Sequence, residues 1–205
     1  MEIDAKGFDR IAREVFAPAY SLIASQIKEK TGIHRGYCLD VGCGGGYLGL
    51  ALARITDLYV YLLDKSQEML EIAQENIIDQ GLRGRAEAVP GDVHQLPFPE
   101  ASVDLVISRG SIFFWDNLEK AFREIYRVLA PGGMTYIGGG FGNKELKEKI
   151  WREMCRRDPE WPHNVKKRWE KVGEFQEKLK LAKINGYEIF QGEAGLWILM
   201  KKGKN

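Results

Sequence analysis

The chain has 205 residues, of which 44% are hydrophobic and 29% are charged. This composition is typical of one folded globular domain and excludes a disordered chain. The formal net charge of +1 provides no global basic field that would attract nucleic acid or an acidic membrane surface.

The three cysteines, Cys38, Cys43 and Cys155, show neither disulfide-framework spacing nor zinc-site spacing. This pattern favours a reducing compartment and predicts a cytoplasmic protein. The N-terminus has no apolar stretch of the signal-peptide type, and no run of about 18 apolar residues predicts a membrane span.

Residues 8–30 show the apolar periodicity of a helix. Pro18 interrupts this stretch, so two short helices are expected before Thr31 and Gly32 end them. The apolar positions are Phe8, Ile11, Val15, Phe16, Leu22, Ile23 and Ile27.

Short apolar runs then alternate with helical patterns. We expect strands at residues 37–42, 58–64, 86–92, 102–110 and 134–140. We expect helices at residues 48–55, 66–82 and 118–133. Ser66 is a good N-cap for the second helix and Gly81 lies near its end, while Pro131 stops the third helix.

The last part of the chain begins with residues 143–184, which are charged and helical, with breaks near Asp158-Pro159 and Trp161-Pro162. Two apolar runs follow, at residues 187–193 and 196–202. The short turn between them leaves no room for a helical crossover. We therefore expect an antiparallel hairpin, which makes one edge strand antiparallel.

The alternation of strands and helices predicts an α/β fold built from βαβ units. We expect a doubly wound, Rossmann-like sheet of seven strands that is mostly parallel, ends in an antiparallel C-terminal hairpin and carries helices on both faces.

A glycine-rich loop lies between the first expected strand and the first helix after it, in the segment DVGCGGGY at residues 40–47. Glycines let the backbone adopt positive φ and approach a ligand closely, and the N-terminus of the next helix presents free N–H groups. Because ligands of open α/β sheets bind at the carboxyl ends of the strands, this segment indicates a nucleotide-like ligand.

Two ligand classes fit this loop. Residues 44–49 match the dinucleotide spacing GxGxxG, and Asp64 lies where a ribose-binding acid is expected, so an NAD(P)-dependent oxidoreductase stays open at this point. Asp40, directly before the loop, favours a ligand with an ammonium group, because a carboxylate would repel a pyrophosphate. A dehydrogenase would also need its own acid–base group, and the only Tyr-x-x-x-Lys match, from Tyr61 to Lys65, spans the end of the second strand.

Four segments, in this order, resemble the motifs of class I S-adenosylmethionine-dependent methyltransferases, especially the ubiquinone/menaquinone-biosynthesis-like small-molecule group. They are LDVGCGGGYLGLALA, LLDKSQEMLEIAQEN, GDVHQLPFPEASVDLVIS and REIYRVLAPGGMTYI. The resemblance covers residues 36–140 well and the terminal hairpin by topology only. It implies an enzyme that uses S-adenosylmethionine, releases S-adenosylhomocysteine and methylates a small molecule.

The resemblance also implies roles for single residues. Asp40 would face the methionine ammonium group, Asp64 would accept hydrogen bonds from the ribose hydroxyls, and Asp92 would read the adenine edge. Met69 would flank the adenine, with ordinary helix packing as the alternative, and Arg109 would lie near the reacting methyl, with a surface position or an ion pair as the alternative. The full implied set of cofactor-binding residues is Asp40, Gly42, Cys43, Gly44, Gly46, Asp64, Lys65, Met69, Gly91, Asp92, Val93, Ser108 and Arg109.

Contacts to the methyl acceptor are expected from the N-terminal helices, from the loop after the fourth strand and from residues 143–184. The candidate residues are Phe16, Tyr20, Ser111, Phe113, Phe114 and Trp115. Their aromatic rings suggest an apolar or flat acceptor, with core packing or a dimer contact as the alternative. Interleaved tryptophans and basic residues in 144–183 admit RNA binding, but a solvated helix pair is favoured.

Methyl transfer requires an in-line nucleophile, and it requires a general base only if the acceptor must lose a proton. We name no catalytic base among His34, His94 and His163, and no metal-ligand cluster is evident. The segment after the fourth strand, SRGSIFFW, lacks the NPPY-type pattern of adenine- and amine-methylating enzymes, which makes nucleic acid an unlikely acceptor.

We expect a single methyltransferase domain over residues 1–205, with an N-terminal helical cap at 1–34, a cofactor-binding core at 36–140 and a helical segment with the hairpin at 141–205. The identity of the acceptor, the atom that is methylated (O, N, C or S) and the choice between monomer and homodimer are not fixed by the sequence. A catalytically silent S-adenosylmethionine-binding protein is a further alternative.

Overall fold

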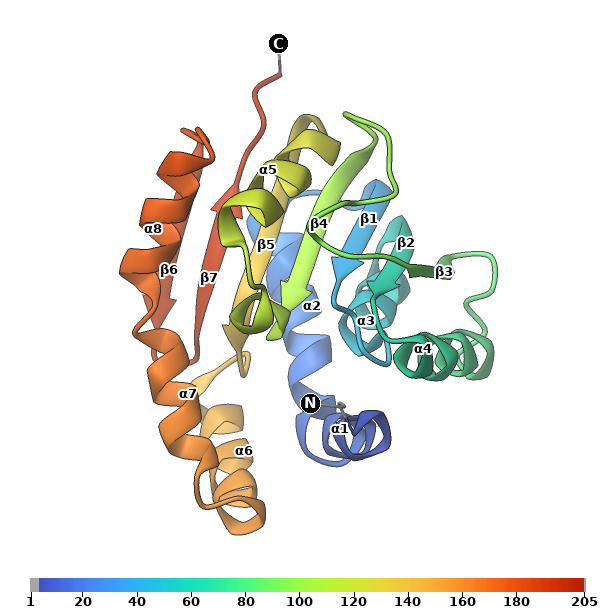
Figure 1. The fold of residues 1–205 in the computed structure, drawn as a ribbon. Helices are drawn as coiled ribbons and strands as arrows, with labels where there is room; N and C mark the ends of the chain where they lie inside the picture. Colours follow the sequence, from blue (N-terminus) through green and yellow to red (C-terminus); the bar gives the residue numbers. More distant parts are fainter. Residues whose placement is uncertain (1–3, 205) are drawn as a thin grey trace.

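The computed structural model describes residues 4–204. One sheet of seven strands forms its centre (Figure 1). The strands are β1 (Arg35–Val41), β2 (Asp57–Asp64), β3 (Ala86–Pro90), β4 (Val103–Arg109), β5 (Leu129–Gly140), β6 (Tyr187–Gly192) and β7 (Gly195–Met200). The α-helices are α1 (Ala5–Ile11), α2 (Ala17–Thr31), α3 (Tyr47–Ile55), α4 (Gln67–Asp79), α5 (Leu118–Val128), α6 (Lys144–Arg157), α7 (Trp161–Trp169) and α8 (Val172–Leu181).

The strand order is β3-β2-β1-β4-β5-β7-β6, and the pairings among β1 to β5 are parallel. This confirms the doubly wound, mostly parallel sheet with a C-terminal hairpin. One detail of the expectation is wrong: the antiparallel strand is β7, inside the sheet, and not the edge strand β6. The reason is that α6, α7 and α8 connect β5 to β6 at the outer edge of the sheet. The turn after β6 then places β7 between β6 and β5.

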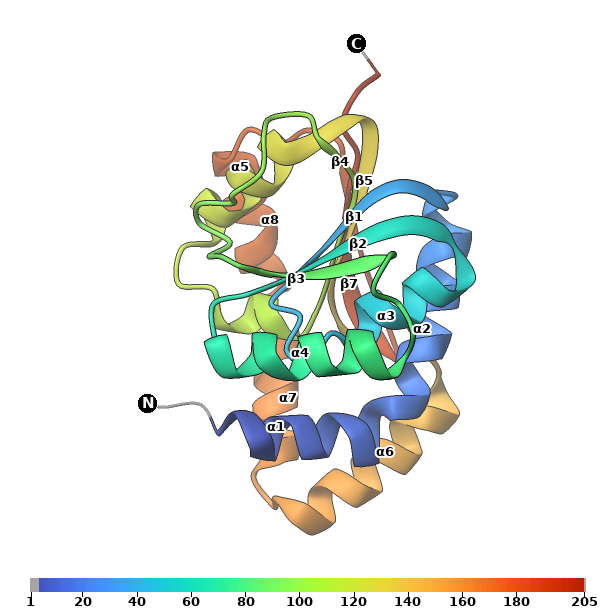
Figure 2. The same cartoon turned by 90° about the vertical axis from the view of Figure 1, so that its right-hand side faces the viewer.

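Helices cover both faces of the sheet. Successive side chains along a strand point to opposite faces, so the side chains on either face are buried. In β1, Cys38 belongs to the core shared with α2 and α3, and its neighbour Leu39 belongs to the core shared with α5 and α8. Figure 2 shows the sheet nearly edge-on between these two layers. The apolar runs in the sequence are therefore continuous rather than alternating.

The second expected helix is α4. The hydroxyl of Ser66 caps it by accepting a hydrogen bond from the Met69 N–H at 3.3 Å. Its buried residues Met69, Ala73 and Ile77 follow the helical period and face the sheet. Gly81, with φ of +69°, lies just beyond its end.

The N-terminal segment differs from the expected pair of short helices. The chain stays helical from α1 through a π-helical turn, Ala12–Phe16, into α2, and Pro18 lies in the first turn of α2, directly after the π-helical turn. The irregularity lies just before Pro18 instead of at it. Phe8, expected on the apolar face, is 57% exposed.

The fifth strand begins earlier than its expected start at residue 134. Helix α5 ends at Val128, and Leu129 already pairs with Val103 of β4. Pro131 therefore lies within the strand, at a stretch where the pairing with β4 shifts register. Within residues 4–204, no helix is long and apolar enough to cross a membrane.

The parallel strands β1 to β4 end at one side of the molecule. In Figure 1 that side, at the bottom of the view, also carries α1, α6 and α7. The glycine loop after β1 and the loops after β2, β3 and β4 therefore open toward helices from both ends of the chain, and this is where the candidate site lies.

Candidate functional site

The glycine loop joins β1 to α3. The N–H groups of Gly42 and Cys43 both donate to the carbonyl of Leu63 at the end of β2, at 2.8 and 3.0 Å. Gly44 has a positive φ of 54°, and Gly46, also at positive φ, is the N-cap residue of α3. The loop thus turns directly over the ends of two neighbouring strands, with backbone N–H groups along it.

Asp64 ends β2 and is tied to the glycine loop. One carboxylate oxygen accepts from the Gly44 N–H at 2.9 Å and the other from the Ser66 N–H at 3.0 Å. The sulfur of the buried Met69 lies against Gly44, at 3.9 Å from where a Cβ on that residue would be. Lys65 is exposed. The structure thus brings together Asp64, Met69 and the loop, and leaves Lys65 at the rim.

Asp40 lies beneath the loop. Its side chain is only 2% exposed, and one carboxylate oxygen accepts a hydrogen bond from the Gly49 N–H in α3 at 3.0 Å. Burial raises the pKa of this carboxyl to about 7; the Gly49 hydrogen bond lowers it and the nearby charge of Asp64 raises it further. Asp40 is therefore poised between its neutral and its ionised form near neutral pH.

The third acid, Asp92, follows β3. Its side chain is exposed, and a single oxygen accepts from both the backbone N–H and the ring Nδ1 of His94, at 2.7 and 2.5 Å. These contacts lower the pKa of Asp92 and leave its second oxygen free. Val93 is buried, and the Gly91 N–H donates to the carbonyl of Asp64 at 3.1 Å, which joins this loop to β2.

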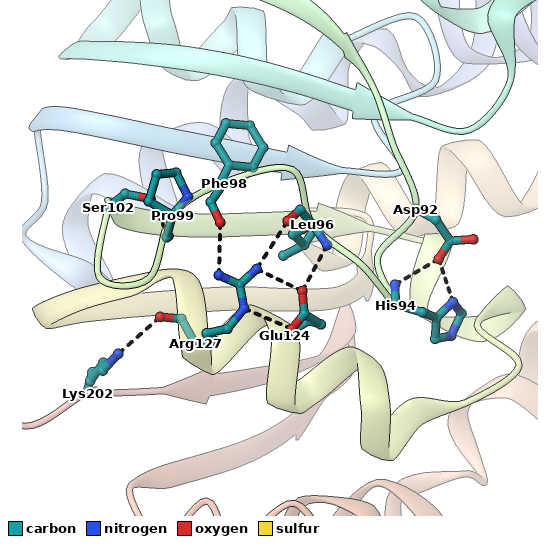
Figure 3. A network of polar contacts seen from close by, with 9 residues as sticks. All are labelled: Asp92, His94, Leu96, Phe98, Pro99, Ser102, Glu124, Arg127 and Lys202. Carbon is teal, nitrogen blue, oxygen red and sulfur yellow. Dashed lines mark hydrogen bonds and ion pairs between the residues drawn. The ribbon is translucent and has the colours of Figure 1, made fainter.

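A network of polar contacts fixes the loop after β3 against α5 (Figure 3). The carboxylate of Glu124 accepts from the Leu96 N–H at 2.9 Å. Arg127 donates to Glu124 and to the carbonyls of Phe98 and Leu96, at 2.9 and 3.1 Å. Glu124 and Arg127 were not among the predicted site residues, although their i,i+3 spacing on a helix is a signal for such a pair. The network holds the loop that presents Asp92.

Ser108 and Ser111 connect the end of β4 to the glycine loop. The Ser111 hydroxyl donates to the Val41 carbonyl at 2.8 Å, so the Ser108 hydroxyl must donate to Ser111, at 2.6 Å. A Cβ on Gly42 would lie 2.4 Å from that of Ser111, so glycine is required there. Ser111 was expected to contact the acceptor; its hydroxyl is bonded within the protein.

Arg109, the last residue of β4, lies close to two aromatic rings from the N-terminal segment. Its guanidinium carbon is 4.5 Å from the ring centre of Phe16 and 5.2 Å from that of Tyr20. Its Nε donates to the Gly140 carbonyl at 2.9 Å. Tyr20 in turn stacks on Tyr47, the first residue of α3, with 5.5 Å between the ring centres. The expected acceptor residues Phe16 and Tyr20 thus meet Arg109 beside the glycine loop.

The other expected acceptor residues lie apart from this group. Phe113 packs against Gly139 and lies 6.2 Å from the ring of Phe175. Trp115 packs against the core that faces α5 and α8. Phe114 is 56% exposed, with the guanidinium of Arg168 at 4.9 Å from its ring. The packing of Phe113 and Trp115 agrees with the alternative of core packing.

Helix α1 also contacts the glycine loop, a contact that was not predicted from the sequence. The hydroxyl of Tyr47 donates to the buried carboxylate of Asp9, which also pairs with Arg13 at 2.8 Å. Asn76 of α4 donates to the Gly45 carbonyl at 2.8 Å. Nothing local in the sequence signals these contacts, because they join residues far apart in the chain.

None of the three histidines is assigned as a catalytic base. His34 and His163 are exposed. The Nε2 of His94 accepts from the Asn117 N–H at 3.2 Å, so its Nδ1 carries the hydrogen that Asp92 accepts. Among residues 4–204, no cluster of three or more His, Cys, Asp or Glu side chains could hold a metal ion.

Comparisons with known proteins agree with the geometry. The family model described as "Methyltransferase domain" matches residues 39–137. A solved structure from Methanococcus maripaludis, described as that of a candidate S-adenosyl-L-methionine-dependent methyltransferase, is 46% identical to the chain. The superposition covers 98% of this chain and 93% of that one, with a TM-score of 0.96.

Two curated proteins are similar over part of the chain. A 2-methyl-6-phytyl-1,4-hydroquinone methyltransferase of Oryza sativa subsp. japonica is 37% identical over 147 residues, which are 71% of this chain and 40% of that protein. A sterol 24-C-methyltransferase of Neurospora crassa is 37% identical over 95 residues, which are 46% of this chain and 25% of that protein. The chain thus spans 25% to 40% of the length of these two relatives.

Proposed function

The chain belongs to the family of S-adenosylmethionine-dependent methyltransferases, and from this premise we propose that it transfers a methyl group from S-adenosylmethionine to a small-molecule acceptor. The product would be S-adenosylhomocysteine. The observation that carries the proposal is the convergence of the glycine loop with three acids, Asp40, Asp64 and Asp92, at the carboxyl ends of β1, β2 and β3.

The residues present fit the cofactor. Each oxygen of Asp64 accepts one backbone N–H and keeps lone pairs for the two ribose hydroxyls. The sulfur of Met69 beside Gly44 offers an apolar wall for the adenine. The free oxygen of Asp92 is available to the exocyclic amine of the adenine, and the buried Asp40 suits the methionine ammonium, directly or through water.

The bound cofactor would supply a methyl carbon on a positively charged sulfur, for transfer to the acceptor nucleophile with the electron pair of the broken carbon–sulfur bond left on sulfur. The chain contributes proximity and orientation, which lower the barrier without a further group. We place Ser108 and Arg109 at the methyl-transfer end and assign no general base.

The wider setting of the reaction is also a proposal. The matched sterol and hydroquinone methyltransferases support a small-molecule acceptor, and the net charge of +1 speaks against nucleic acid. We propose the cytoplasm as its location, from cysteine usage, and either a monomer or a homodimer as its assembly.

The first test is calorimetric titration of the protein with S-adenosylmethionine, S-adenosylhomocysteine and NAD. We expect binding of the first two and a loss of about tenfold to a hundredfold in Asp64→Ala, because two hydrogen bonds to a charged group are removed. The matched control is Asp57→Ala, an exposed acid at the other end of β2. Binding of NAD alone would overturn the proposal and would support the alternative that the protein is an NAD(P)-dependent oxidoreductase.

A further inference from the structure

Arg109 is a largely enclosed cation to which residues 4–204 provide no anion. It forms no ion pair with any described carboxylate; its neighbours are the rings of Phe16 and Tyr20 and the carbonyl of Gly140. Burial lowers the pKa of its guanidinium, which reflects the cost of keeping a charge away from water. A buried guanidinium that has no carboxylate partner in the protein suggests that it binds a negatively charged ligand.

The guanidinium is held in one orientation. Its Nε is used by the Gly140 carbonyl at 2.9 Å, while the two terminal nitrogens have no hydrogen-bond partner among the described residues. No buried side-chain nitrogen or oxygen among the described residues is left without a hydrogen-bond partner, so these two nitrogens reach solvent-accessible space. The rings of Phe16 and Tyr20 pack on it and leave a planar fork of donors that matches a carboxylate.

The surroundings of this fork divide into two sides. On one side, Tyr20 stacks on Tyr47 at the end of the glycine loop. On the other side, the ring of Phe16 lies 6.2 Å from that of Phe141 and 6.5 Å from that of Trp161. The fork therefore lies between the proposed cofactor site and an aromatic cluster that continues into α7.

We propose that Arg109 binds a carboxylate of the methyl acceptor, and that the acceptor is a flat, apolar carboxylic acid whose body lies against the partly exposed rings of Phe16 and Trp161. This rests on the proposed function and names its substrate class. A carboxylate could also come from the methionine part of the cofactor. The acceptor is favoured because Phe16 and Trp161 continue the apolar surroundings of the fork toward α7, whereas the glycine loop lies on the side of Tyr20 and Tyr47.

The experiment compares wild type with Arg109→Gln and Arg109→Lys, with Arg54→Gln, an exposed arginine of α3, as the control. Circular dichroism melts establish that each variant folds. Titration with S-adenosylhomocysteine and with its decarboxylated analogue then isolates the cofactor carboxylate. With saturating S-adenosylhomocysteine present, naphthoate and the uncharged naphthamide are titrated as acceptor probes.

We expect wild type to bind naphthoate about tenfold to a hundredfold more tightly than naphthamide. Arg109→Gln should lose this preference, Arg109→Lys should keep part of it, and both should bind S-adenosylhomocysteine as wild type does. A loss confined to S-adenosylhomocysteine, with its decarboxylated analogue unaffected, would assign Arg109 to the cofactor and overturn the inference. Equal binding of the two probes, or no binding of naphthoate, would also overturn it. Failure of wild type to bind S-adenosylhomocysteine would instead contradict the proposed function itself.

Discussion

Asp40 is a carboxylic acid placed where water hardly reaches it. It accepts one hydrogen bond, from the Gly49 N–H, and its pKa of about 7 lies far above the ordinary value of 3.8 for an aspartate. A neighbouring positive charge would favour the ionised form and lower that pKa. Binding of an ammonium-bearing ligand and ionisation of Asp40 should therefore be linked.

This linkage predicts that cofactor affinity depends on pH. Below pH 7 the raised pKa keeps Asp40 protonated in the free protein, so binding must expel a proton; above pH 7 the carboxylate is already formed. The affinity for S-adenosylhomocysteine should rise roughly tenfold between about pH 6 and about pH 8 in wild type, and the rise should disappear in Asp40→Asn. Calorimetry in buffers of different ionisation enthalpy measures both the affinity and the proton release.

The exposed Asp79→Asn serves as the control for Asp40→Asn. If Asp40 only braced the glycine loop, Asp40→Asn would weaken binding equally at both pH values. That result would assign Asp40 a bracing role and would contradict the proposed contact with the ammonium group.

At the scale of elements, the joint between β5 and β7 depends on a buried hydroxyl. Thr135 of β5 accepts from the Met200 N–H at 2.8 Å and donates to the Ile198 carbonyl at 3.2 Å. Its side chain thus replaces part of the backbone ladder between the pairs Ile137–Ile198 and Met134–Lys201, which share one register. The hairpin is held to the parallel sheet through this residue as well as through backbone pairs.

Replacing this hydroxyl should weaken the joint. Thr135→Val keeps the shape but leaves a buried N–H and a buried carbonyl without partners, which should cost about 1–3 kcal/mol of unfolding free energy. In a domain of this size, each kcal/mol lowers Tm by about 2–4 °C. Thr135→Ser keeps the hydroxyl and should retain most of the stability. Equal denaturation midpoints for Thr135→Val and wild type would contradict this role.

The strands and helices were largely predictable because each has a local signature. Runs buried on both faces located β1, β2, β4 and β5, and Ser66 with Gly81 located α4. The place of β7 between β5 and β6 was not predictable, because either side of β6 satisfies a hairpin and the choice depends on long-range pairing. The early start of β5 depends likewise on the pairing of Leu129 with Val103.

The candidate site divides in the same way. The acids Asp40, Asp64 and Asp92 were expected to lie close together, because they stand at the carboxyl ends of parallel strands, which meet at one edge of the sheet. The contact of Asp9 with Tyr47 joins residues 38 positions apart without any motif and was missed. Ser111 was assigned to the acceptor from its place in an aromatic loop, whereas only the three-dimensional packing puts it against Gly42. The individual cofactor and acceptor contacts stay predictions.

At the scale of the whole molecule, the N-terminal segment covers the site end of the sheet. Helix α1 contacts α4 and the glycine loop, and α2 packs along α3. The π-helical turn between α1 and α2 marks an irregular point in an otherwise continuous helix, a feature frequent at functional sites. Opening of α1 would uncover the loop.

The bond between Tyr47 and Asp9 should set how often that opening occurs. Tyr47→Phe removes one hydrogen bond of about 1 kcal/mol, so amide hydrogens of α1 should exchange roughly fivefold faster. Tyr37→Phe, at an exposed tyrosine of β1, should leave them unchanged. Hydrogen exchange followed by mass spectrometry measures both variants. Unchanged exchange in Tyr47→Phe would show that other contacts hold α1.

The position of β7 inside the sheet has a consequence for biosynthesis. As the nascent chain emerges from the ribosome, β1 to β5 can pair in parallel, but β5 remains an open edge and β6 has no neighbour until residues 195–200 have left the exit tunnel. The sheet therefore cannot be completed before β7 has been synthesised, and an edge stays exposed to other chains until then. A cell making this protein has the most to gain from a chaperone that covers this edge before β7 pairs with it.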